Sequence, residues 1–329
     1  MSLKKRFNGP LHAVALGLAM MAAQPAVAAY PSSQQINVVV PFVPGGPVDI
    51  MARLVSERLS ASLKTTVVVE NRPGAGGNVG SAHVARSNPD GRTLLLASGS
   101  ILTMNEAIYA SLPFSPEKDF ITVSVVGDMP LIVGVHPSVP AQTLPEFVDY
   151  ARKNPEKIFF SSPGNGTTPH AGAALFNAET SIKTTHVPYK GGAESGAAVL
   201  SGTVTGAIDS PPALLPHIQS GRVKALAIAG PQRLSQLPDV PTTAEAGLPG
   251  LQVVSWFALA APSGTPQATL DILNAEVRKA LQDPGLRERF AALAIRPVGD
   301  DLATAAAFTK SERERWAKVI RDANIRIDN

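Results

Sequence analysis

A strand, a glycine turn and a helix start follow one another in the stretch Val38-Val39-Val40-Pro41-Phe42-Val43-Pro44-Gly45-Gly46-Pro47-Val48-Asp49, which a predicted helix over Ile50–Ser60 continues. Glycines at such a turn let main-chain N–H groups point toward a guest, and the helix dipole adds roughly half a positive charge. A carboxylate or phosphate is therefore favoured here without a cationic side chain. The alternative is a plain Gly-Gly turn in which Asp49 only complements the helix dipole, and this stretch alone leaves both interpretations open.

Outward from this stretch, short apolar runs alternate with longer amphipathic segments, the pattern of βαβ units. Most of the runs lack polar alternation, as expected for strands that helices cover on both faces. The predicted strands are Ile36–Val40, Thr66–Val69, Thr93–Ala97, Ile121–Val126, Leu131–Val135, Ile158–Ser161, Thr185–Val187, Gly206–Ile208, Val223–Ala229 and Val253–Ala260. We therefore expect an α/β fold with mainly parallel sheets.

Helix starts and ends are marked by capping residues, prolines and glycines. The long C-terminal helix is amphipathic and is expected to pack across a lobe. The predicted helices are one that begins at the capping box Thr143-Leu144-Pro145-Glu146, one from Thr265-Pro266 to Gln282, one between Gly191 and Gly202, Pro212–Ser220, and Leu302–Ile325.

Composition limits the class of protein. The chain has 329 residues, and at about 150 residues per domain this length suggests two domains. It contains no cysteine, which excludes disulfides, thiolate catalysis, cysteine-ligated zinc and iron–sulfur clusters. Its 29 Lys and Arg exceed its 26 Asp and Glu by three, and the three extra charges are Lys4, Lys5 and Arg6.

Those three residues open a segment that is typical of a secretory signal, residues 1–28. An apolar run over Leu11–Ala23 follows, and then the small residues Ala26-Val27-Ala28, after which cleavage is expected. The alternative is an uncleaved anchor, but the run is shorter than the ~20 apolar residues of a spanning helix. We expect an exported, soluble protein that is near neutral once the segment is removed, and we do not expect nucleic acid as a partner.

A second glycine cluster, Glu70-Asn71-Arg72-Pro73-Gly74-Ala75-Gly76-Gly77-Asn78-Val79-Gly80, superficially suggests a dinucleotide fingerprint. The spacing is wrong, since G-x-G-x-x-G from Gly74 needs glycine where Val79 stands. No P-loop, G-x-S-x-G or H-E-x-x-H motif occurs either.

A third loop, Phe160-Ser161-Ser162-Pro163-Gly164-Asn165-Gly166-Thr167-Thr168-Pro169-His170, also leaves a strand and enters a helix, and its hydroxyls and helix start favour an anion. The alternative makes Thr168 an N-cap, Pro169 the first helical residue and His170 a structural partner, and capping and binding can coexist. Loops at 186–192 and 206–211 end further strands, and the carboxyl ends of parallel strands share one edge. We therefore expect these loops to converge on one crevice.

Five stretches of the sequence resemble the periplasmic Bug-type substrate-binding receptors of tripartite tricarboxylate transporters, and the resemblance covers nearly all of the mature chain. The stretches are Pro41–Gly46, Glu70–Gly77, His186-Val187-Pro188-Tyr189-Lys190-Gly191, Leu237-Pro238-Asp239-Val240-Pro241-Thr242 and Trp256-Phe257-Ala258-Leu259-Ala260-Ala261-Pro262.

The resemblance implies an α/β, two-lobed periplasmic binding protein, a type II-like Venus flytrap whose lobes are sheets flanked by helices. Lobe 1 would combine residues 30–129 and 252–329, lobe 2 would be 130–251, and hinges would lie near Met129 and Leu251. One ligand carboxylate would be held by main-chain groups of the Pro44-Gly45-Gly46 turn. The expected partners are a small carboxylate and the membrane permease subunits, and we expect a monomer with no cofactor, no metal and no catalysis.

Three positions depart from the pattern of the relatives. Val48 stands where many of them have a hydroxyl residue, Ala174 where they often have Glu, and Glu194 where they often have Pro. These departures leave open which carboxylate is bound: an amino acid, a di- or tricarboxylate, or an aromatic acid.

Two other classes of function are weighed against a receptor for uptake or sensing. An exported enzyme acting on an organic acid would need paired carboxylates or a nucleophile with a base, and only Asp49, His170 and Asp209 offer scattered titratable groups. An adhesion or structural module would not need glycine turns at successive strand ends. The predicted ligand-binding residues are Val43, Pro44, Gly45, Gly46, Val48, Asp49, Ser98, Ser162, Gly166, Thr167, Thr168, His170 and Asp209.

Overall fold

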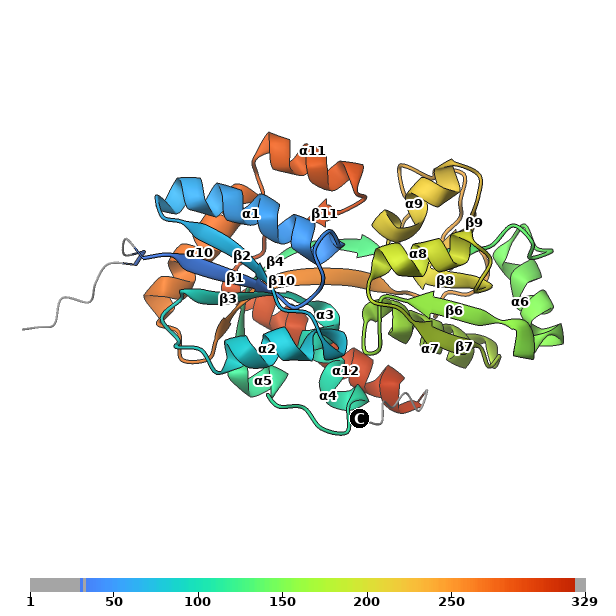
Figure 1. The fold of residues 1–329 in the computed structure, drawn as a ribbon, viewed down its shortest axis with the longest axis horizontal. Coiled ribbons are helices and arrows are strands. Elements are labelled where there is room, and N and C mark those ends of the chain that lie inside the picture. Colours follow the sequence, from blue (N-terminus) through green and yellow to red (C-terminus); the bar gives the residue numbers. More distant parts are fainter. Residues whose placement is uncertain (1–29, 32–33, 323–329) are drawn as a thin grey trace, which may run out of the picture.

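The computed structural model describes residues 30–31 and 34–322, so the predicted signal segment lies outside the described residues. Two sheets lie side by side, each with helices on both faces (Figure 1). We call the part built around the six-stranded sheet lobe 1 and the part around the five-stranded sheet lobe 2. Among the described helices, none is long and apolar enough to cross a membrane.

The sheet of lobe 1 has the strand order β11-β4-β10-β3-β1-β2. Strand β1 pairs in parallel with β2 and β3, whereas β10 runs antiparallel to β3 and β4, and β11 runs antiparallel to β4. The bounds are β1 Ile36–Val40, β2 Val67–Asn71, β3 Thr93–Ser98, β4 Phe120–Pro130, β10 Val254–Pro262 and β11 Arg296–Pro297.

The sheet of lobe 2 has the order β7-β6-β8-β5-β9. Strand β6 pairs in parallel with β7 and β8, and β5 runs antiparallel to β8 and β9. The bounds are β5 Ile132–Val135, β6 Phe159–Ser162, β7 Thr185–Pro188, β8 Gly206–Asp209 and β9 Lys224–Ile228.

The expectation of mainly parallel sheets is wrong for the half of each sheet nearest the crossovers. The chain leaves lobe 1 along β4, enters lobe 2 at β5, and returns along β10, which lies directly beside β4. A returning strand beside an outgoing one must run in the opposite direction, so the crossover strands are antiparallel to their neighbours. Parallel pairing is confined to β2-β1-β3 and β7-β6-β8.

Both faces of each sheet are buried, which explains the apolar strands. In β1, Val38 and Val40 pack with α1, α10 and α11, while Val39 packs on the opposite face with α2 and α3. In lobe 2, α6 and α7 cover one face, and α8 and α9 cover the other. The helices are α1 Pro47–Leu63, α2 Asn78–Ala85, α3 Gly99–Thr103, α4 Asn105–Ile108, α5 Pro116–Asp119, α6 Leu144–Lys153, α7 Thr168–Thr180, α8 Gly192–Leu200, α9 Pro211–Gln219, α10 Gln267–Ala280, α11 Pro284–Ala292 and α12 Leu302–Asp322, with 3-10 turns at Ala75–Gly77 and Pro155–Lys157.

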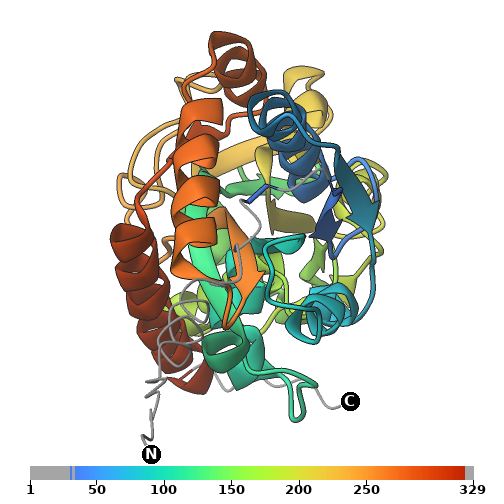
Figure 2. The ribbon, with the colours of Figure 1, turned by 90° about the vertical axis from the view of Figure 1, so that its left-hand side faces the viewer.

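The C-terminal helix α12 joins the two lobes. It packs on β4 and α3 of lobe 1, while Trp316 and Ile320 near its end enter the core of lobe 2 (Figures 1 and 2, red). The same helix therefore contributes apolar side chains to both lobes, as its long amphipathic pattern allows.

The ten predicted strands are present with bounds shifted by a few residues, and the two-residue β11 was missed because so short a strand has no periodicity. The capping box at α6 is confirmed, since the Thr143 hydroxyl accepts a hydrogen bond from the N–H of Glu146. Helix α1 begins at Pro47, three positions before the predicted start at Ile50. The glycine turn therefore leads directly into the helix.

Candidate ligand-binding cleft

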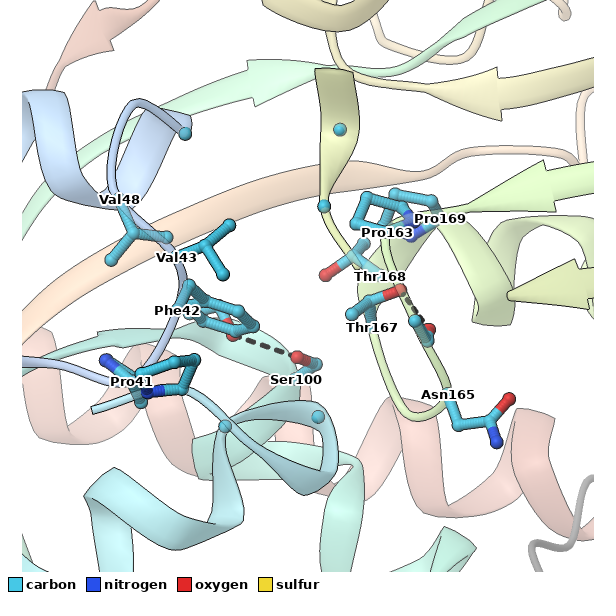
Figure 3. Close-up of a pocket in the computed structure, with 18 of the residues that line it drawn as sticks. Pro41, Phe42, Val43, Val48, Ser100, Pro163, Asn165, Thr167, Thr168 and Pro169 are labelled. Atoms are coloured by element: carbon cyan, nitrogen blue, oxygen red, sulfur yellow. Dashed lines mark hydrogen bonds between the residues drawn. The ribbon is translucent and has the colours of Figure 1, made fainter. Parts of the chain in front are cut away.

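A cleft with a volume of ≈ 680 Å³ opens between the lobes where the strand-end loops meet. Such a volume falls in the range of ~300–1,000 Å³ that is usual for small-molecule sites. Figure 3 shows Phe42 and Val43 of lobe 1 on one side of it and Pro163, Thr168 and Pro169 of lobe 2 on the other. The lining residues are Pro41, Phe42, Val43, Gly46, Pro47, Val48, Pro73, Gly74, Ala75, Gly76, Gly77, Ser98, Ser100, Tyr109, Pro163, Gly164, Asn165, Thr167, Thr168, Pro169, Pro188, Tyr189, Lys190, Gly191, Gly192, Asp209, Ser210, Ser255 and Phe257.

The start of α1 opens into this cleft. Gly45 has φ +84°, a left-handed conformation that favours glycine, and Gly46 is the N-cap with φ −79° and ψ 170°. The first N–H groups of a helix have no partner within the helix, so the N–H groups that follow Gly46 can donate hydrogen bonds to an anion. Since Pro47 has no N–H, the donors at this end are those of Gly46 and the residues after Pro47.

Asp49 lies behind the turn and stabilises it. Its carboxylate accepts hydrogen bonds from the N–H of Gly45 at 3.0 Å, from Arg53 at 2.9 and 3.0 Å, and from the Asn71 amide at 2.9 Å. Burial raises the pKa of Asp49, but these hydrogen bonds outweigh burial and hold the pKa below its usual value. The N–H of Gly45, predicted to hold the ligand, is thus already used by Asp49.

The end of β3 supplies two hydroxyls on the lobe 1 side. Ser98 is the N-cap of α3, and its hydroxyl lies 2.9 Å from that of Ser100 (Figure 3). Both residues are buried and line the cleft. The pair can turn one hydroxyl proton toward a ligand because each group both donates and accepts.

On the lobe 2 side, the loop before α7 presents a free hydroxyl. The N-cap is Thr167 and not Thr168, and the Thr167 hydroxyl donates to the carbonyl of Gly164 at 2.7 Å. Thr168 is the first helical residue, and its hydroxyl, which borders the cleft, has no hydrogen-bond partner within the described chain. Thr168 can therefore donate to a ligand.

Two stacked histidines hold this loop from behind. The rings of His170 and His186 are 3.9 Å apart at 15°, His170 Nδ1 accepts the N–H of Gly166 at 3.2 Å, and the Ser162 hydroxyl lies 2.6 Å from His186 Nε2. Burial lowers the pKa of His170 to about 4, and burial together with the charge of His170 lowers the pKa of His186 to about 3. The bond from Gly166 requires an unprotonated Nδ1 on His170, and the lowered pKa values make both imidazoles neutral at pH 7.

Asp209 is the last residue of β8 and lines the cleft on the lobe 2 side. It is fully buried, and its carboxylate accepts hydrogen bonds from the Ser195 hydroxyl at 2.7 Å and from the N–H and hydroxyl of Ser210 at 2.7 and 3.3 Å. Burial raises the pKa of Asp209 to about 6, although these three hydrogen bonds lower it. No cation forms an ion pair with Asp209 within the described part of the chain.

The lobes touch each other at the edges of the cleft. The hydroxyl of Tyr109, in lobe 1, donates to the carbonyl of Asn165, in lobe 2, at 3.1 Å. Gly166 (φ +72°) lies so close that a Cβ there would be 2.7 Å from the Tyr109 ring, and a Cβ on Gly191 would be 3.1 Å from Val43. The structure therefore has the lobes in direct contact over the cleft.

Seven of the thirteen predicted site residues line the cleft, namely Val43, Gly46, Val48, Ser98, Thr167, Thr168 and Asp209. The other six do not, and they are Pro44, Gly45, Asp49, Ser162, Gly166 and His170. Of these six, Gly45 and Asp49 bond to each other, and Ser162, Gly166 and His170 belong to the histidine-supported loop. They shape the loops and do not border the space between them.

Sequence reasoning did not place several lining residues in the ligand site, among them Phe42, Ser100, Tyr109, Asn165, Ser255 and Phe257. Phe42 and Asn165 stood inside loops that were singled out, so proximity could have found them. Tyr109 lies outside every glycine loop, and only the tertiary fold brings it to the cleft. Within the described chain, no group of three or more His, Asp or Glu side chains is placed to hold a metal ion.

Comparisons with known proteins agree with this architecture. The sequence-family model described as tripartite tricarboxylate transporter family receptor matches residues 51–325 of this chain. The protein BugT of Bordetella pertussis is 36% identical over 299 residues, which cover 91% of this chain and 91% of BugT.

Solved structures show the same fold. R. palustris Rpa4515 with adipate superposes with a TM-score of 0.85 at 32% identity, covering 91% of this chain and 100% of that one. MatC from Rhodopseudomonas palustris with bound malate gives 0.82 at 34% identity, covering 87% and 98%. The periplasmic binding protein BugD gives 0.83 at 31% identity, covering 91% and 100%.

Proposed function

This chain belongs to the tripartite tricarboxylate transporter family of receptors, and from that premise we propose that it closes two lobes around a small carboxylated metabolite and hands it to a membrane permease. The protein is a periplasmic, carboxylate-binding solute receptor. What the proposal adds is how the ligand is held, where the chain bends and what happens to the ligand afterwards.

The start of α1 is the observation that carries the proposal. The Gly45-Gly46 turn, fixed from behind by Asp49, aims the first N–H groups of α1 at the cleft. Lys190 is the only cation among the described lining residues, so a carboxylate here is satisfied by N–H and O–H donors. We assign the lobe 1 contacts to Gly46, Val48 and the Ser98–Ser100 pair, and the main lobe 2 contact to Thr168.

The lobes move relative to each other at the two crossovers. Lobe 1 comprises residues 30–129 and 252–329, lobe 2 comprises 130–251, and the bends lie near Met129 and Leu251. This division is supported by the sheets, since β4 and β10 belong to one sheet and β5 to β9 to the other. Rotation about these two connections leaves each sheet intact, as in other hinge closures, and requires Trp316 and Ile320 of α12 to shift against the lobe 2 core.

The remaining parts of the proposal concern processing, partners and chemistry. The signal segment is removed after Ala28, and the mature receptor works as a monomer with the permease subunits of a tripartite transporter. It does not turn its ligand over. Support for this comes from the cleft: the carboxylate of Asp209 is fully buried and already accepts hydrogen bonds from Ser195 and Ser210, and the two neutral histidines, His170 and His186, are not among the described lining residues.

Calorimetry with a panel of carboxylates tests the proposal. We expect at least one small carboxylate to bind with 1:1 stoichiometry, and Thr168→Val to weaken it about tenfold or more, because a hydrogen bond to a charged group contributes roughly 1.5–3 kcal/mol. Thr66→Val is the matched control, since Thr66 is exposed and is not among the lining residues. Equal losses in both variants, or binding of sugars or peptides instead of carboxylates, would contradict the proposal.

A further inference from the structure

The apolar wall beside the anion-binding turn is the feature that distinguishes one end of the cleft. All lining residues contributed by the stretch 41–48 are apolar or glycine: Pro41, Phe42, Val43, Gly46, Pro47 and Val48. Figure 3 shows Val48, Val43 and Phe42 following one another along this side of the cleft. A ligand whose carboxylate lies at the start of α1 therefore places its next atoms against two isopropyl groups and a phenyl ring.

The facing wall in lobe 2 is also apolar at its centre. The rings of Pro163 and Pro169 border the cleft opposite Val43, and Phe257 of β10 lines it as well. Apolar surface removed from water stabilises a complex in proportion to its area. The middle of the cleft thus favours a ligand with an uncharged, apolar body.

The helix starts at the lobe 2 end offer few main-chain donors for a second carboxylate, although the free Thr168 hydroxyl also borders the cleft there. Helix α9 begins Pro211-Pro212, two positions without an N–H, and the N–H of Ser210 before them is taken by Asp209. Helix α7 has Pro169 in its first turn. Two of the three helices that start on this side therefore offer fewer main-chain donors than an ordinary helix start.

The third helix start, that of α8, carries an acid of its own. The carboxylate of Glu194 accepts the N–H of Lys190 at 3.2 Å, just before the helix. Lys190 is exposed, and the buried carboxylate of Asp209, which lines the same end of the cleft, adds a second negative charge. A second ligand carboxylate would lose its water here near the buried carboxylate of Asp209, while Lys190 is exposed and the exposed Glu194 adds a negative charge just outside the lining, which is unfavourable.

Resting on the proposed function, we infer that the ligand is a monocarboxylate with an apolar body, such as a ring acid or a branched aliphatic acid, and that di- and tricarboxylates bind more weakly. Val48 and Glu194 are the residues that set this preference. Val48 places an isopropyl group, which has no donor, next to the ligand carboxylate, and Glu194 adds a negative charge beside Lys190 at the opposite end.

Calorimetry with four probes tests the inference: benzoate and cyclohexanecarboxylate against adipate and malate. We expect the better ring acid to bind at least tenfold more tightly than either dicarboxylate. Val48→Thr should lower the ratio of benzoate to malate affinity by at least about fivefold, whereas Val68→Thr, the same change at a valine of β2 outside the cleft, should leave it unchanged.

Glu194→Gln should raise the affinity for adipate at least about threefold and leave that for benzoate unchanged. The matched control is Glu146→Gln, because Glu146 accepts the N–H of Gln142 at the start of α6 just as Glu194 accepts that of Lys190 at α8. Thermal unfolding of each variant shows whether it is folded.

Several results would overturn the inference. Adipate or malate binding as tightly as the ring acids would do so, as would failure of all four probes to bind, or an unchanged ratio in folded Val48→Thr together with unchanged adipate binding in Glu194→Gln. Mass spectrometry of the ligand that copurifies distinguishes a wrong ligand class from a wrong proposed function. A dicarboxylate there refutes the ligand class and leaves the proposed function standing, whereas a compound without a carboxylate refutes both.

Discussion

Replacing Tyr109 by Phe removes one hydrogen bond between the lobes and little else. The hydroxyl donates to the Asn165 carbonyl at 3.1 Å, and burial raises the pKa of Tyr109, so the O–H keeps its proton at neutral and mildly alkaline pH. A neutral hydrogen bond contributes about 0.5–1.5 kcal/mol, which corresponds to a factor of about 2–13 in an equilibrium constant. We expect the closed form of Tyr109→Phe to be less populated by this factor, and the ligand to dissociate faster by a similar factor.

Stopped-flow dissociation and small-angle scattering measure the two effects. The expected results are a dissociation rate constant raised about 2- to 13-fold and, without ligand, a larger radius of gyration than that of the unmodified protein. Tyr150→Phe is the control, because Tyr150 lies on α6 and outside the cleft lining. Unchanged rate and unchanged scattering in Tyr109→Phe would refute the idea that this contact stabilises closure.

Gly166→Ala tests the same contact by adding volume. A Cβ at this position would lie 2.7 Å from the Tyr109 ring and 2.9 Å from its hydroxyl, and Gly166 also has φ +72°. The lobes must then separate or the loop must shift, so the loss of closure should exceed that in Tyr109→Phe. Identical behaviour of Gly166→Ala and the unmodified protein would show that the lobes do not approach each other here.

The remaining predictions concern the anion site, a surface cation and acid sensitivity. Gly46→Pro should weaken carboxylate binding about tenfold or more in calorimetry, because it removes the N–H and its ring distorts the turn at Gly45, while Gly46→Ala, which keeps the N–H, should change it little. Arg72→Gln should change affinity by about 0.5 kcal/mol or less, because Arg72 pairs with Glu70 at the surface; abolished binding would mean that this cation holds the ligand. The pKa values of His170 and His186 are lowered in the folded protein to about 4 and 3, whereas a histidine in the unfolded chain has a pKa of ~6.5. Below pH ~6.5 the unfolded chain therefore binds more protons than the folded protein. The two neutral histidines stabilise the fold fully above that pH, and this stabilisation is lost toward pH 4 by about 1.4 kcal/mol per pH unit for each histidine. Asp209, with its pKa raised to about 6, acts in the opposite direction between pH 6 and 4; urea unfolding at pH 7 and 5 should still show a net loss at pH 5, and a gain would contradict the assignment of neutral histidines.

Local features of the fold could be predicted because local chemistry determines them. The turn at Gly45-Gly46, the capping box at Thr143 and the apolar strands each depend on neighbouring residues only. The antiparallel direction of β10 could not be predicted in the same way, because it depends on which strand lies beside β4 after a return through the whole of lobe 2.

The binding site, like the fold, could be predicted where local sequence determines it and not where the tertiary fold does. Loops rich in glycine and hydroxyls were identified from sequence, and seven of the thirteen predicted site residues line the cleft. From the sequence, the supporting roles of Asp49 and His170 could not be distinguished from direct contact with a ligand. A side chain that supports a loop and one that faces a ligand are equally polar. Tyr109 had no signal at all, since its contact with Asn165 joins residues 56 positions apart in different lobes.

The crystal structure of the mature receptor with the carboxylate that calorimetry finds to bind most tightly tests the anion site at the start of α1 most directly. We predict one ligand carboxylate within hydrogen-bond distance of the main-chain N–H groups at Gly46 and Val48, with Asp49 still bonded to Gly45 behind them and the Thr168 hydroxyl turned toward the ligand. A ligand carboxylate paired instead with Lys190 or Arg72, with the start of α1 facing only water, would contradict the account.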